Sequence, residues 1–186
     1  PIVTVSIEPL RYFVEAIGGD RFQVNTLVPA GASPETYELT PQQVVQTTDS
    51  RAYFCVGTLG FEQERLRKLT ENAPNLLVVN SSDSIVLLED NHVHDQQHQH
   101  IEGIDLHTWL STTSGKQIAR NVLRGLCQVD SANAAFYQQR HDSLVQHIDS
   151  LDGEIRQILR PLVHRTFMIY HPALGYFARD YGLQQI

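Results

Sequence analysis

The sequence predicts an α/β protein with one parallel-sheet lobe and its flanking helices, a long connecting helix, and the start of a second α/β lobe. Four short apolar segments alternate with helical segments over the first 80 residues, which is typical of a parallel sheet covered on both faces. Apolar residues then follow one helical face over residues 132–160, and a new apolar segment comes after it. We expect an N-terminal lobe at 1–112, a helical connector at 113–162, and the beginning of a C-terminal lobe at 163–186.

The first 28 residues predict a β-α-β unit. Residues 2–7 alternate β-branched residues with hydroxyl residues, as a strand does. Leu10, Val14 and Ile17 follow helical spacing, and the two glycines that come next provide a helix stop. Residues 22–28 alternate again and predict the second strand.

Two further strands complete the predicted sheet. The sequence Thr-Pro-Gln-Gln at 40–43 predicts a helix start, with a threonine cap, a proline at the first helical position, and a glutamine that can bond back to the cap. Apolar strands are expected at 52–56 and 76–79, with a helix at about 62–72 between them.

The second half of the chain is predicted to be mostly helical. Residues 118–129 show one helical face, and the helix at 132–160 would be about 43 Å long. A proline ends it, residues 166–170 predict a strand, and residues 172–180 predict a helix. A single strand and helix would leave their apolar faces uncovered, so we expect the natural protein to continue beyond Ile186.

Charge and composition narrow the classes of partner. The 186 residues include 21 acidic and 14 basic side chains, a formal net charge of −7. This charge disfavours a phosphate backbone, so no nucleic-acid partner is expected, and it suits a cationic ligand. No apolar run approaches the roughly 18 residues that a membrane span requires. Cys55 and Cys127 lack CxxC spacing and are expected to be free, apolar-packed thiols.

Residues 89–102 form a segment rich in His, Asp, Glu, Gln and Asn. This composition cannot bury a core and predicts a mobile loop. Neutral imidazoles on a flexible acidic tether can collect borderline metals weakly, and the alternative is a solvated loop with no role. The candidate auxiliary ligands are His92, His94, His98 and His100.

Three more ligand-type side chains follow predicted structural elements near strand ends, where open α/β sheets form their binding crevices. Glu35 follows the second strand, His107 follows the polar loop, and His171 ends the fifth strand. Taken singly, each has an ordinary alternative: a solvated glutamate, a packed histidine, and a histidine that only ends a strand before proline.

The segments at 28–41, 105–110 and 170–183 resemble the signature segments of the zinc- and manganese-binding solute-binding proteins of ABC transporters, an adhesin-type lipoprotein family. The resemblance extends over the whole chain. It implies two α/β lobes joined by a rigid helix, with the metal held in the cleft between them. The ligands it implies are Glu35, His107 and His171, with a carboxylate beyond Ile186 as the fourth.

The sequence departs from the family pattern at three places. Glu35 stands where histidine is more usual, Leu106 stands where proline is usual, and residues 111–113 replace an acidic residue and proline. Two imidazoles and a carboxylate suit Zn²⁺ and also Mn²⁺. His171 favours the zinc branch, so Zn²⁺ is the expected cargo and Mn²⁺ the alternative.

The resemblance implies an extracytoplasmic solute-binding protein, and not an enzyme, that captures Zn²⁺ for the membrane permease of an ABC transporter. Zinc-specific members often carry a His-rich acidic loop at the place of residues 89–102. The chain opens with a strand and not with an export signal, so we expect that a signal peptide has been removed. A membrane tether through an N-terminal lipid outside this chain is left open.

Two other functions are consistent with parts of the sequence. A metal-buffering protein would work through the His-rich loop alone and would need neither Glu35 nor His171. A zinc hydrolase is suggested by residues 92–98, which approximate an HxHxDH pattern, but the acid comes one position early and the third histidine one late. The chain also has no HExxH, GxSxG or GxxxxGK[ST] motif.

Overall fold

The computed structural model describes residues 1–186 except 64–67, 69–70, 72 and 90–102. Its N-terminal part is built on one sheet with the strand order β2-β1-β3-β4, and every neighbouring pair is parallel. The predicted parallel sheet is therefore confirmed. The strands are β1 (Ile2–Val5), β2 (Gln23–Thr26), β3 (Ala52–Cys55) and β4 (Leu77–Asn80).

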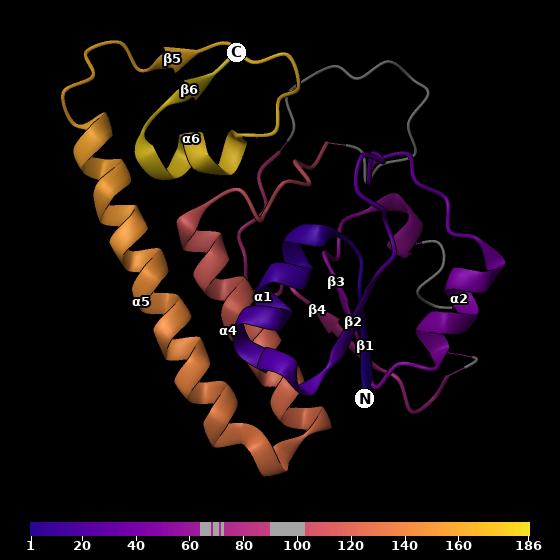
Figure 1. The fold of residues 1–186 in the computed structure, drawn as a ribbon. Helices are drawn as coiled ribbons and strands as arrows, with labels where there is room; N and C mark the ends of the chain where they lie inside the picture. The colour runs from indigo at the N-terminus through magenta and orange to yellow at the C-terminus, as the bar shows by residue number, and fades with distance from the viewer. Residues whose placement is uncertain (64–67, 69–70, 72, 90–102) are drawn as a thin grey trace.

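Helices α1 (Glu8–Gly18) and α4 (Thr112–Val129) pack on the sheet, and α5 (Ala134–Leu159) packs on both of them. Figure 1 shows these three helices on one side of the sheet and α2 (Pro41–Thr48) on the other. The backbone of α4 approaches the sheet closely at Gly125, where a Cβ atom would lie 2.7 Å from the side chains of Phe54 and Val79. Glycine is therefore required at this crossing.

The helix termini follow the sequence signals. The helix α1 ends at Gly18, and its C-cap residue Gly19 has a φ of +62° that favours glycine. Thr40 and Gln43 form the predicted capping box at the start of α2: the Thr40 hydroxyl accepts a hydrogen bond from Gln43 N, and the Gln43 side chain accepts one from Thr40 N. Two short 3-10 helices, η1 (Gly19–Arg21) and η2 (Ser131–Asn133), connect α1 to β2 and α4 to α5.

The long helix predicted at 132–160 is present as α5, within two residues at each end. Its N-terminal half buries Tyr137 and Leu144 against the first lobe. Its C-terminal half leads away from the sheet (Figure 1). Leu151 and Ile158 in this half are exposed. None of the helices in the described part of the chain has the length and apolar character needed to span a bilayer.

The chain ends in a small C-terminal unit made of β5 (Thr166–Phe167), α6 (Gly175–Tyr181) and β6 (Gln184–Gln185), with β5 and β6 parallel. It lies near the carboxyl ends of the first lobe's strands, opposite the N-terminus (Figure 1).

This unit differs from the prediction in two ways. The strand expected at 166–170 is shorter and the helix expected at 172–180 starts later, because Ala173 N donates to the His171 carbonyl in a tight turn before α6. The second strand, β6, was not predicted, because two glutamines carry no strand pattern.

Two expected segments fall largely on undescribed residues. Glu62 and Gln63 are helical, but most of the helix expected at 62–72 lies outside the described residues. The loop expected at 89–102 lies outside them apart from Glu89, whose backbone forms an isolated antiparallel bridge with Ile104. The division into lobes at residues 112 and 162 stays a prediction.

Candidate metal centre

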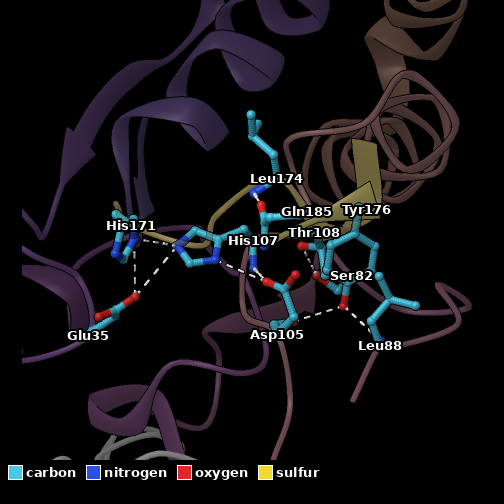
Figure 2. A network of polar contacts seen from close by, with 10 residues as sticks. All are labelled: Glu35, Ser82, Leu88, Asp105, His107, Thr108, His171, Leu174, Tyr176 and Gln185. Carbon is cyan, nitrogen blue, oxygen red and sulfur yellow. Dashed lines mark hydrogen bonds and ion pairs between the residues drawn. The ribbon is translucent and has the colours of Figure 1, made fainter. Parts of the chain in front are cut away.

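The structure brings together the three side chains selected from the sequence. Glu35 comes from the loop after β2, His107 from the segment before α4, and His171 from the turn between β5 and α6. One ligand-type atom of each lies within 4.8 Å of the other two. Figure 2 shows both imidazoles and the carboxylate directed toward a common point.

The separations match the geometry of a zinc ion. The two Nε2 atoms of His107 and His171 are 3.1 Å apart, and each lies 3.5 Å from Oε1 of Glu35. The corners of a triangle with these sides are each about 2.0 Å from a shared centre, which is close to the usual Zn–N and Zn–O distances. An ion could therefore contact all three atoms without a large movement of any of them.

Glu35 lies on a loop that is fixed at its base by the first turn of α2. The side-chain amide of Gln43 donates to the Leu27 carbonyl at 2.7 Å and to the Tyr37 hydroxyl at 3.0 Å. The Tyr37 ring also meets the Phe61 ring edge to face, with centroids 6.3 Å apart. The loop that carries the carboxylate is therefore held on both sides of Glu35, whose side chain is 24% exposed.

His107 is the most enclosed of the three, with 12% of its side chain exposed. One carboxylate oxygen of Asp105 accepts from the His107 backbone N at 2.9 Å and lies 3.0 Å from the ring Nδ1 (Figure 2). Because a carboxylate only accepts, this contact places the ring proton on Nδ1 and leaves the lone pair of Nε2 free for a metal.

His171 is more open, with 57% of its side chain exposed. The chain immediately after it is fixed by the C-terminal unit, because Leu174 N donates to the Gln185 side chain at 2.7 Å. The buried Tyr176 hydroxyl donates to the Asp105 carbonyl at 2.9 Å. Burial raises the pKa of Tyr176, so this hydroxyl stays protonated at neutral pH.

The three departures from the family pattern have clear local roles. Leu106 is 5% exposed and belongs to the hydrophobic core of the first lobe. Ser111 is the N-cap of α4, accepting from Ser114 N, and it also donates to the Asp180 carboxylate. Glu35 offers a carboxylate oxygen to the cluster that it forms with the two histidines.

Sequence reasoning missed the residues that support the ligands. An Asp-x-His sequence could have suggested Asp105, since aspartate side chains often bond the backbone two residues on. Tyr176 and Gln185 act across the fold and left no local signal. The four loop histidines, His92, His94, His98 and His100, lie outside the described residues.

Comparisons with known proteins identify relatives of this chain. Residues 3–186 match the family model of the zinc-uptake complex component A, periplasmic (ZnuA). A zinc-bound deletion mutant of a ZnuA protein is 38% identical, with a TM-score of 0.88, and the match covers 100% of this chain and 68% of that one. A second ZnuA crystal structure is also 38% identical, with a TM-score of 0.87, covering 100% of this chain and 69% of the other.

Two curated relatives are named as components of a zinc uptake system and of a manganese ABC transporter. ZnuA of Bacillus subtilis is 24% identical over 99% of this chain and 59% of its own length. The manganese ABC transporter substrate-binding lipoprotein PsaA of Streptococcus anginosus is 25% identical over 90% of this chain and 55% of its own length. The chain spans about 60% of the length of the curated relatives it matches. Since the family model covers nearly every residue, the chain belongs to the ZnuA family of zinc-uptake components.

Proposed function

We propose that this chain belongs to an extracytoplasmic solute-binding protein that captures Zn²⁺ and delivers it to the membrane permease of an ABC transporter. The observation that carries the proposal is the convergence of Glu35, His107 and His171 at separations that suit one zinc ion. The names of the relatives, which include zinc-uptake proteins and a manganese transporter component, support it.

The proposed site binds its cargo without making or breaking a covalent bond. Two neutral imidazoles and one carboxylate donate to the ion, and three ligands leave one position of a tetrahedral ion for water or another carboxylate. The carboxylates of Glu35 and Asp105 supply negative charge that attracts a dication. Protons compete for the imidazoles, so the affinity for Zn²⁺ should fall as the pH falls.

The preference for zinc is part of the proposal, with Mn²⁺ as the alternative. Two imidazole nitrogens favour Zn²⁺ over Mn²⁺, whereas the carboxylate oxygen accepts either ion. The site is built on loops that are fixed at their bases, so uptake and release should use small ligand-loop movements rather than a wide hinge motion. A lipid tether at the N-terminus would keep the protein near its permease.

The test is a calorimetric titration with Zn²⁺. Replacing His107 and His171 by alanine should abolish the tight site, whereas deleting residues 91–100 should remove only weak additional sites. A matched control replaces His147 and His164, two exposed histidines outside the site, and should bind Zn²⁺ as the wild type does.

Loss of all zinc binding on deletion of the loop would instead support a metal-buffering protein. Hydrolysis of an ester or lactam by the zinc-loaded chain would support an enzyme. Tight binding that survives in the His107 and His171 double variant would contradict the proposal.

A further inference from the structure

We propose that Gly175 and Tyr176, the first two residues of α6, are positioning residues for the metal site. They hold Asp105 in place, and Asp105 in turn sets the orientation of the His107 ring. This inference rests on the proposed function, since it assigns these two residues to the same zinc site. Neither of them reaches the ion.

The first contact is a close steric fit between Gly175, which has no side chain, and the carboxylate of Asp105. A Cβ atom at this position would overlap Oδ2 of Asp105, so the carboxylate occupies the space that any other residue would fill. The other oxygen of the same carboxylate accepts from the backbone N and lies against ring Nδ1 of His107. A residue larger than glycine would therefore push the carboxylate away from its contact with the ring.

The second contact fixes the backbone of the same aspartate. The hydroxyl of Tyr176, a fully buried side chain, donates to the Asp105 carbonyl at 2.9 Å and accepts from Leu88 N at 3.2 Å. Asp105 N donates to the Leu88 carbonyl at 2.9 Å. Figure 2 shows Tyr176 contacting Asp105 on the side opposite His107. The start of one helix therefore leaves room for the side chain of Asp105 and fixes its backbone.

This arrangement connects two ligands that are 64 positions apart in the chain. The segment that runs from His171 into α6 supplies one imidazole directly and positions the other, on His107, through Asp105. Docking of α6 on the first lobe and assembly of the zinc ligands should therefore be coupled. A residue that only packs the helix would affect stability without a specific effect on the His107 ring.

Two matched pairs of variants separate these roles. Gly175→Ala is compared with Gly153→Ala, a glycine inside α5 whose added Cβ would meet nothing within 4 Å. Tyr176→Phe is compared with Tyr181→Phe, which removes another buried hydroxyl of α6, one that bonds Asp152 and Thr112 instead of Asp105. Asp105→Ala removes the residue through which Gly175 and Tyr176 should act.

Two readouts are measured on each variant: zinc affinity by calorimetry, and ¹⁵N NMR of the His107 imidazole in the metal-free chain. Gly175→Ala and Asp105→Ala should each lower zinc affinity about 10- to 100-fold, as is usual for residues that orient a metal ligand. Tyr176→Phe should lower it several-fold. All three should shift His107 away from the form protonated at Nδ1. Gly153→Ala should leave both readouts unchanged, and Tyr181→Phe should leave the His107 spectrum unchanged.

A double-mutant cycle supplies the decisive comparison. If Gly175 acts through Asp105, the Gly175→Ala, Asp105→Ala double variant should bind zinc about as well as Asp105→Ala alone. The inference would be overturned if the fold-losses of zinc affinity in the two single variants multiplied in the double variant. An unchanged His107 spectrum in Gly175→Ala and Tyr176→Phe would also overturn it. If Gly175→Ala does not fold, the Tyr176→Phe and Tyr181→Phe pair decides.

Failure of the inference and failure of the proposed function look different. The NMR signature is measured without metal, so it reports the positioning of His107 whether or not zinc binds. Unchanged zinc binding in His107→Ala would contradict the proposed function and leave the NMR result standing.

Discussion

The N-terminal sheet with its helices, called here the first lobe, and the C-terminal unit of β5, α6 and β6 are held in place by different forces. The first lobe has a continuous apolar core in which β1, β3 and the inner faces of α1 and α4 are almost completely buried. The C-terminal unit has two strands of two residues each and exposes most of Val163, Met168 and Tyr170. Hydrophobic burial dominates the first region, whereas the second buries Tyr176, Ala178 and Tyr181 and adds polar contacts with the first.

Those polar contacts lie where α6 meets α4 and α5. Asp152 of α5 accepts from the hydroxyls of Thr112 and Tyr181, and Ser111 donates to Asp180. Glu35 and His107 thus lie on the part with the large core, whereas His171 lies on a small unit that is fixed by a few buried side chains and by hydrogen bonds. We conclude that the His171 side of the site should be the easier one to displace.

The largest expected effect comes from breaking the core of the first lobe. Phe54 is completely buried on β3, beneath Gly125 of α4. Phe54→Ala should lower the free energy of unfolding by about 3–5 kcal/mol, because it removes a large buried ring and leaves a cavity. Urea unfolding followed by circular dichroism measures this. A loss below about 1 kcal/mol would show that the sheet-helix core is not the main source of stability.

A smaller loss is expected from a buried polar group in the same lobe. The Glu62 carboxylate is 1% exposed and accepts from the Ser6 hydroxyl and from three backbone N–H groups that follow β3, those of Val56, Gly57 and Leu59. Glu62→Gln should lower the free energy of unfolding by about 2–4 kcal/mol, because an amide NH₂ would face backbone donors that then lack an acceptor.

The control for Glu62 is Glu154→Gln, the same exchange at an exposed position of α5. It should change the free energy of unfolding by less than about 0.5 kcal/mol. Equal losses in the two variants would mean that the buried carboxylate contributes nothing specific.

The smallest effect is expected at the contact between the two regions. Asp152→Asn should lower the free energy of unfolding by about 1–2 kcal/mol, because it weakens charge-assisted hydrogen bonds from Arg156, Tyr181 and Thr112. Hydrogen exchange should show faster opening of α6 with little change in the sheet. Uniform acceleration of exchange throughout the chain would contradict the proposed difference between the regions.

The pH dependence of this contact has a definite sign. Hydrogen bonds from Arg156, Tyr181 and Thr112 lower the pKa of Asp152 to about 2. A lowered carboxyl pKa stabilises the fold above the ordinary aspartate pKa of about 3.9, and the contribution is lost as the pH falls toward 2. Between these values the wild type should lose more stability than Asp152→Asn. The control Asp149→Asn, in an exposed pair with Lys116, should behave like the wild type.

The sequence predicted the elements whose signals are local. The capping box at Thr40 and Gln43 and the stop at Gly19 come from neighbouring residues, and the structure confirms both. The strand β6 was missed because its two glutamines are held by pairing with β5, which no local pattern records. The start of α6 was misplaced because a tight turn from His171 to Ala173 precedes it, and Gln185 holds the next residue, Leu174, from a distant part of the chain.

The candidate site divides in the same way. Glu35, His107 and His171 could be selected because they are ligand-type residues near strand ends, and the structure brings them together. The fit of Asp105 against Gly175 joins residues 70 positions apart, and it depends on a side chain that is missing, so no sequence pattern reveals it. Residues that donate to a metal leave a chemical signal, whereas residues that position them act through the fold.

The central claim is that Glu35, His107 and His171 bind one shared Zn²⁺ ion. The direct measurement is a crystal structure of the zinc-loaded chain with anomalous difference maps at the zinc absorption edge. One strong peak is expected at about 2.0–2.2 Å from Nε2 of both histidines and from a carboxylate oxygen of Glu35. A zinc peak elsewhere, with the three side chains well ordered and no peak between them, would contradict it.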